Sequence, residues 1–144
     1  MISFGTNLKR MIESYDLEVL TDIPNKKIWQ DPDTNLIWQV KIEDKKYIWR
    51  DIQKYADKLN REKYGGYNDW RVPTLNELKT ILIKKKYNSL YIKEPLSKLK
   101  YNVHWSSSED LSDAWAILFY YGGINRYSKT HKYYVRCVRG IQKI

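Results

Sequence analysis

The hydrophobic pattern of this chain changes from helical spacing in the middle to alternation in the last third, and this order constrains the fold strongly. From Ile48, apolar residues recur at i, i+4, i+7, i+8 and i+11, which predicts an amphipathic helix ended by Gly65-Gly66. In RVPTLNELKTIL, Thr74 and Glu77 fit a capping box and predict a second helix. The runs AWAILFYY, INRYS and YYVRCVRG then alternate like strands. Helices followed by several strands predict an α+β domain with helices segregated from an antiparallel sheet.

Four further segments complete the predicted organisation. KKIWQDPDTNLIWQVKI predicts a β-hairpin, because turn-forming residues separate two apolar runs. Residues 87–104 lack a clear period and predict a long surface connection, and SSSEDLSD (106–113) predicts a polar loop. Residues 1–25 predict an N-terminal extension with a short amphipathic helix, ahead of a single domain at 26–144.

The chain is basic and rich in aromatic residues. Its 144 residues include 26 Lys and Arg against 17 Asp and Glu, for a formal net charge of +9, with six Trp and thirteen Tyr. This charge favours polyanionic partners such as nucleic acid, an acidic polysaccharide or an anionic membrane, although a lysine-rich surface without a ligand gives the same count. No apolar run approaches the roughly 20 residues of a membrane span. The start lacks a signal-peptide pattern, so we expect a cytoplasmic protein, or a secreted or cell-surface one if a leader was removed.

Cys137 is the only cysteine and lies between Arg136 and Arg139. It could serve as a nucleophile, a metal ligand, half of a disulfide or a small core residue. The core is favoured, because in a strand Arg136 would point to the opposite face and the only candidate bases are His104 and His131. The histidines and cysteine lack zinc spacing, and too few carboxylates cluster for calcium. We expect no catalytic residue, metal or cofactor.

In the segment DWRVPT, Asp69 and Arg71 could belong to a functional site or have a structural role, and the structural role is favoured. In the structural reading, Trp70 is a core ring and Arg71 pairs with a carboxylate or with carbonyl groups. Trp105 and Trp115 are likewise expected in the core. Ser106–Ser108 lack a base or a nucleophile turn for hydrolysis.

Residues 120–134 are the predicted binding surface. Tyrosines and cations are interleaved there around Gly122-Gly123, a combination that suits sugars and anions. A solvated hairpin with tyrosines alternating between core and surface would give the same pattern. The loop at 105–113 and the lysines between 84 and 100 are expected to contribute. The predicted ligand-binding residues are Tyr120, Tyr121, Asn125, Arg126, Tyr127, Lys129, His131, Lys132 and Tyr133.

Five motifs follow one another along the chain in this order: LIWQ, GGYNDWRVPTLNEL, HWSSSE, AWAILFYYGG and YYVRCVRG. Because of them, the chain resembles the C-terminal domain family of the Legionella collagen-like protein over about residues 28–140. The resemblance implies a C-type-lectin-like fold, related to formylglycine-generating enzymes, with two helices on a small twisted antiparallel sheet, paired terminal strands and long loops. It also implies an adhesin-like binding module, since the namesake domain is associated with sulfated polysaccharides. The family commonly has a second cysteine where this chain has Ala56. The resemblance therefore implies that Cys137 has lost a disulfide partner.

These observations favour a non-catalytic recognition module that binds an anionic polysaccharide or a protein partner through aromatic and basic loops. A nucleic-acid-binding basic domain is one alternative. A divergent enzyme related to formylglycine-generating enzymes is another, although that resemblance implies copper held by paired cysteines and the chain has one. A homo-oligomeric scaffold assembled through the N-terminal extension is a third.

Overall fold

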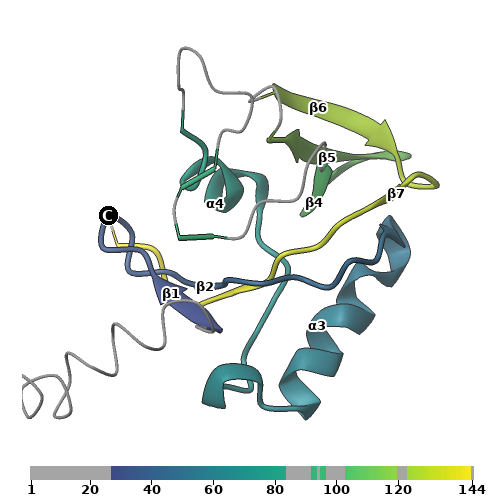
Figure 1. Cartoon of the computed structure of the whole chain (residues 1–144). Coiled ribbons are helices and arrows are strands. Elements are labelled where there is room, and N and C mark those ends of the chain that lie inside the picture. The colour runs from purple at the N-terminus through teal and green to yellow at the C-terminus, as the bar shows by residue number, and fades with distance from the viewer. Residues whose placement is uncertain (1–26, 84–91, 94, 97–102, 120–122, 144) are drawn as a thin grey trace, which may run out of the picture.

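The computed structural model describes residues 27–83, 92–93, 95–96, 103–119 and 123–143. Within them, three small antiparallel sheets and two short α-helices form an α+β fold, as predicted (Figure 1). The predicted N-terminal helix lies outside the described residues. In the described part of the chain, no helix is long and apolar enough to cross a lipid bilayer.

The first sheet joins the two ends of the domain. It has the order β1-β2-β8, from β1 (Ile28–Gln30), β2 (Ile37–Gln39) and β8 (Val138–Arg139). The predicted hairpin is confirmed, with Trp29 opposite Trp38 and a turn in which the Asp31 carboxylate accepts a hydrogen bond from the Asp33 N–H at 2.9 Å. The pairing of β8 with β2 confirms that the terminal strands meet.

The first predicted helix begins later than the apolar spacing indicates. Tyr47–Ile48 form strand β3, Trp49–Asp51 form the 3-10 turn η3, and α3 runs over Ile52–Arg61. Ile48 shares the helical spacing but is extended, because β3 pairs with β7 (Lys132–Tyr133). The helix ends before the two glycines, which lie in the 3-10 turn η4 (Tyr64–Gly66).

Gly65 of η4 has a backbone conformation that depends on glycine. Its φ is +62°, and a Cβ there would lie 2.6 Å from Cγ2 of Ile28. The glycine therefore lets the chain leave α3 and pass close to β1.

The second helix is confirmed with its capping box. In α4 (Leu75–Lys79), Thr74 Oγ1 accepts from the Glu77 N–H at 3.1 Å, and the Thr74 N–H donates to Glu77 Oε1 at 3.0 Å. The Arg71 guanidinium contacts the Glu77 carboxylate and donates to the Gly140 carbonyl at 3.0 Å. The structural reading of Arg71 is therefore correct, because its charge connects the start of α4 to the end of β8.

Two segments predicted to be loops were misread. The polar stretch SSSEDLSD belongs to a hairpin, in which β4 (Val103–Asp110) turns at Leu111–Ser112 into β5 (Asp113–Leu118), with β6 (Gly123–Ser128) on the far side of β5. Ser106 is fully buried because its hydroxyl donates to the Trp115 carbonyl at 2.7 Å.

The predicted surface connection at 87–104 contributes to the core. Ile92 and Leu96 are 3% and 2% exposed, and Ile92 forms an isolated bridge with Leu82. Val103 and His104, the last two residues of the segment, begin strand β4.

The run YYVRCVRG is not one strand, which corrects another prediction. Between β7 and β8 the chain, yellow in Figure 1, crosses from one sheet to another. The Tyr134 N–H donates to the Val103 carbonyl and the Cys137 carbonyl accepts from the Gln39 N–H, at 2.9 and 3.1 Å. Arg136 is fully buried, and its guanidinium donates to the Gln39 and Val40 carbonyls at 2.5 and 2.6 Å. Its charge is therefore not displayed beside the thiol.

The core has two clusters. The first surrounds α3 and contains Cys137, Ala56, Trp70 and Trp105, all at most 2% exposed. The second lies against α4 and includes Leu36, Trp38, Leu78, Ile81, Ile117, Phe119 and Val138. Trp115, in contrast to its prediction, is only half-buried, with the Arg126 guanidinium 5.6 Å from its ring centroid.

The buried thiol yields a testable prediction. Cys137 is a free cysteine, and burial raises the pKa of its thiol. We expect thiol reagents to modify it only as fast as the whole domain unfolds. The substitution Cys137→Ser should lower the free energy of unfolding by about 1–3 kcal/mol, because it buries a hydroxyl in an apolar cluster. The substitution Cys137→Ala should lower the free energy of unfolding by less. Urea denaturation measures both, and rapid labelling of the folded protein would contradict the core assignment.

His104 gives a prediction about pH. It is fully buried against Phe119 and Tyr134, with ring centroids 5.1 and 6.2 Å away, and among the described residues neither ring nitrogen has a hydrogen-bond partner. Burial, aided by the Arg136 guanidinium, lowers the pKa of His104 well below its usual 6.5. Below pH 6.5 the unfolded chain therefore binds a proton at His104 that the folded domain does not bind. Acid thus stabilises the unfolded state relative to the folded one.

We expect the free energy of unfolding to decrease as the pH falls below the ordinary pKa of 6.5, by up to about 1.4 kcal/mol per pH unit from this residue. Urea denaturation between neutral and mildly acidic pH measures the slope. His104→Leu should flatten it, because the leucine side chain has no group to protonate. An identical slope in His104→Leu would contradict the assignment.

Candidate functional site

The residues of the predicted binding surface are divided among several environments. Tyr120 and Tyr121 lie outside the described residues. Asn125, Arg126 and Tyr127 belong to β6, an edge strand of its sheet, and Lys132 and Tyr133 form β7. The exposed members are Asn125, Arg126, His131 and Lys132.

Two of the predicted cations are held by neighbouring carboxylates. The Arg126 guanidinium pairs with Asp110, and the Lys129 ammonium lies 2.6 Å from Glu109 Oε1. Lys129 also lies 4.5 Å from the ring centroid of Trp49. The β4–β5 hairpin, predicted to be a ligand-binding loop, therefore neutralises these cations.

The predicted tyrosines pack as part of the core boundary. Tyr133 is half-buried, with its ring centroid 4.9 Å from that of Trp105 and 5.0 Å from that of Tyr127. His131 lies at the outer end of this group, 5.8 Å from Tyr133. Tyr127 and Tyr133 therefore both pack toward the core boundary.

The lysines at 84–100 were predicted to contribute to binding, and Lys93 is the one among them that the structure describes. Lys93 places its ammonium 2.9 Å from both Asp31 and Asp33, and Asp31 is fully buried. These two carboxylates neutralise the charge of Lys93. The other lysines of that stretch lie outside the described residues.

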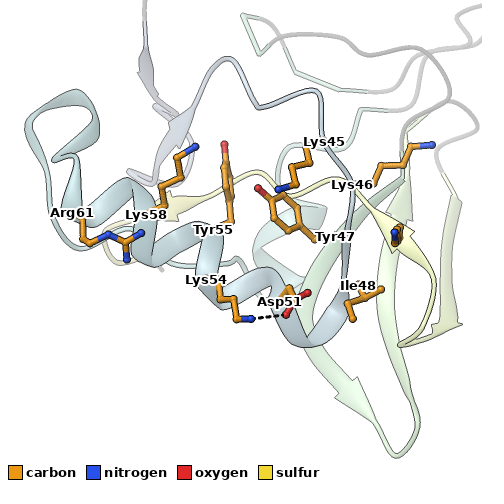
Figure 2. Close-up of a pocket in the computed structure, with 10 residues that line it drawn as sticks. Lys45, Lys46, Tyr47, Ile48, Asp51, Lys54, Tyr55, Lys58 and Arg61 are labelled. Carbon is orange, nitrogen blue, oxygen red and sulfur yellow. Dashed lines mark ion pairs between the residues drawn. The ribbon is translucent and has the colours of Figure 1, made fainter.

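A groove between α3 and the β3–β7 pair gathers cations in excess of carboxylates. Its volume is about 510 Å³ (Figure 2). Asp51 is the one carboxylate among its described lining residues. We call it the basic groove after its six cations: Lys45, Lys46, Lys54, Lys58, Arg61 and Lys132.

Two tyrosines stand between the cations of the basic groove. Figure 2 shows the rings of Tyr47 and Tyr55 side by side, with Lys58 on one flank and Lys45 on the other. The two ring centroids are 5.5 Å apart, and the Lys45 ammonium lies 5.1 Å from the centroid of Tyr47. Burial raises the pKa of both phenols, and the Glu43 carboxylate adds to the shift at Tyr47. Both rings therefore stay neutral at physiological pH and do not repel an anion.

The cations differ in how free they are. Lys54 pairs with Asp51 at 3.2 Å on an exposed helix face, and Lys58 pairs with Glu43 at 2.6 Å. For the other four, no carboxylate of the described residues lies within ion-pair distance: Lys45, Lys46, Arg61 and Lys132. An anion entering the groove meets several cations that have no carboxylate partner in the described part of the chain.

Sequence reasoning missed most of this groove. Lys54, Lys58 and Arg61 follow i, i+4, i+7 along α3, so helical spacing of cations was an available signal. The two lysines before β3 reach the same groove only because β3 pairs with β7, a contact between distant parts of the chain. Lys132 is the one predicted site residue that lines the groove.

The described residues offer little for catalysis or metal binding. His104 is enclosed in the core, Cys137 has a raised thiol pKa, and the two do not form a site with any third ligand. In the described part of the chain no three His, Cys, Asp or Glu side chains are arranged to hold a metal ion. What the described surface offers a ligand is positive charge and aromatic side chains.

Comparison with known proteins places this architecture in a family. No curated protein matches the chain. The family model of the Lcl C-terminal domain matches residues 27–139, which include both helices and all three sheets. The resemblance inferred from the five motifs is thereby confirmed, and the chain belongs to the Lcl C-terminal domain family.

Proposed function

We propose that this domain is a non-catalytic recognition module that binds an acidic polysaccharide along the basic groove. The observation that carries the proposal is the groove's composition, six cations and one carboxylate around the half-buried ring of Tyr47. Unpaired cations attract anions over a distance, and a groove focuses that attraction. Aromatic rings offer flat apolar faces, which suit the apolar faces of sugars better than they suit a simple inorganic anion.

Each part of the basic groove has a role in this proposal. Lys54, Lys58 and Arg61 form one row along α3, and Lys45, Lys46 and Lys132 form the opposite row. Sulfate or carboxylate groups on a sugar chain would alternate between these rows, held by charge-assisted hydrogen bonds. Tyr47 would contact a sugar ring between them, and Tyr55, which is only 3% exposed, would support the Tyr47 ring from the core side.

The predicted surface at β6 and β7 extends the proposed site. Lys132 belongs to both, so a chain leaving the groove would pass His131 and the exposed side of β6 at Asn125. The C-type-lectin-like and adhesin-like character implied by the resemblance is part of the same proposal. A protein partner with an acidic face, or a nucleic acid, would use the same charges and is distinguished by experiment.

The proposed function predicts that binding depends on the salt concentration. Binding to dextran sulfate, measured by calorimetry or fluorescence anisotropy, should weaken at least about tenfold between about 50 and about 200 mM salt, because several ion contacts are screened. Neutral dextran is the control and should not bind measurably. Binding that is indifferent to salt would contradict the polyanion proposal, and tighter binding of single-stranded DNA at equal salt would favour the nucleic-acid alternative.

The second prediction locates the site. Lys54→Gln with Arg61→Gln should weaken dextran sulfate binding by about tenfold, since each exposed ion contact contributes up to about 1 kcal/mol. Lys79→Gln with Lys143→Gln removes the same charge outside the groove and should have a much smaller effect. Arg126→Gln with Lys129→Gln tests the β6 surface. Equal losses in all three double variants would indicate attraction by net charge alone.

A further inference from the structure

The pairing of Lys58 with Glu43 has a meaning beyond stability, given the proposed function on which this inference rests. Lys58 lines the basic groove and also a second groove of about 510 Å³ on the other side of Tyr55. The second groove contains the carboxylates Glu43 and Glu62, the further cations Lys27 and Lys41, and a partly apolar lining that includes Leu59 and Tyr64. Lys58 and Tyr55 therefore mark the junction of two adjoining grooves.

Glu43 places its carboxylate on the cation at this junction. Oε2 lies 2.6 Å from the Lys58 ammonium, and Oε1 accepts a hydrogen bond from the Tyr47 hydroxyl at 2.7 Å. The Lys58 contact is the main reason that the pKa of the Glu43 carboxyl is lowered, so the group is ionised at neutral pH. A carboxylate of the chain thus occupies the position at which Lys58 and Tyr47 would meet an anionic group of a ligand.

This ion pair is open enough to exchange partners. The side chains of Lys58 and Glu43 are 42% and 37% exposed, so water reaches both. The carboxylate that supports a structural role, Glu77, is 12% exposed at its side chain and also completes a capping box. Glu43 completes no helix cap, and its two side-chain partners both line the basic groove.

We propose that Glu43 is a built-in competitor for Lys58, which an acidic chain running from the basic groove into the second groove has to displace. The anionic group of the ligand takes over the contacts with the Lys58 ammonium and the Tyr47 hydroxyl, and the Glu43 side chain turns to solvent. The consequence is a threshold on affinity. A ligand with few or poorly placed anionic groups does not repay the lost ion pair, so Glu43 selects for densely charged chains.

The test uses dextran sulfate and the full chain. Glu43→Gln keeps the size and the hydrogen-bond acceptor but releases Lys58, so the dissociation constant should decrease about two- to fivefold, the range of an exposed ion pair. Asp69→Asn is the matched control, because it frees Arg139 from an ion pair that lies outside both grooves and outside the β6 surface, with side chains 54% and 21% exposed for Asp69 and Arg139. It should change the affinity by clearly less. Thermal unfolding of each variant checks that the fold is retained.

A double variant separates release of Lys58 from loss of a negative charge. In Lys58→Gln, adding Glu43→Gln should give no further gain, because the cation that Glu43 occupies is gone. Persistence of the full gain in that background, or an equal gain in Asp69→Asn, would overturn the competitor role while leaving the proposed function standing. If neither the natural chain nor Glu43→Gln binds dextran sulfate, the proposed function fails and the competitor role fails with it. Binding by Glu43→Gln alone would support strong competition.

Discussion

The structure depends on the backbone pairing of residues 134–138, which connect the three sheets. Tyr134 exchanges hydrogen bonds with β4, Cys137 receives one from β2, and Val138 exchanges two with Arg71 before α4. This short segment bonds to β4 at Tyr134 and joins the β2–β8 ladder at Val138, so it ties together elements that are far apart in the sequence. The buried Arg136 guanidinium adds bonds to the Gln39 and Val40 carbonyls, and burial lowers its pKa to about 10. A buried charge is costly unless it is bonded, so these carbonyls have to stay in place.

The basic groove is a product of the same constraint. The crossing segment begins at β7, and the pairing of β7 with β3 sets Lys132 opposite α3. The loop that carries Lys45 and Lys46 is positioned by the start of β3. Two rows of cations therefore face each other because two strands of only two residues pair across the chain. Net charge alone could not have revealed this arrangement, since it counts cations without locating them.

The sequence was informative wherever the signal was local. The capping box at Thr74 and Glu77, the β1–β2 hairpin and the buried face of α3 each depend on residues within a few positions of one another. The predictions failed where long-range pairing decided the structure. Ile48 has helical spacing but is held in β3 by Lys132, and the serine-rich stretch reads as a loop although Ser106 is buried by its bond to Trp115.

The site was predicted less well than the fold, for a related reason. The sequence predicted a site from the tyrosines and cations interleaved in 120–134, but it could not say that Asp110 and Glu109 would neutralise Arg126 and Lys129. Nor could it show that Lys58 would be shared between two grooves. The turn at Leu111, where φ is +58° without a glycine, hid the hairpin that supplies those acids.

The enclosed, unpaired sulfur of Cys137 has a consequence for where this fold can be assembled. Its cluster is closed by apolar side chains, with Ala56 in the same group and no second thiol in the chain. Maturation of the domain thus requires neither an oxidant nor a disulfide isomerase, and the redox potential of the surroundings does not set its stability. The same domain can reach its native state in an oxidising or in a reducing compartment.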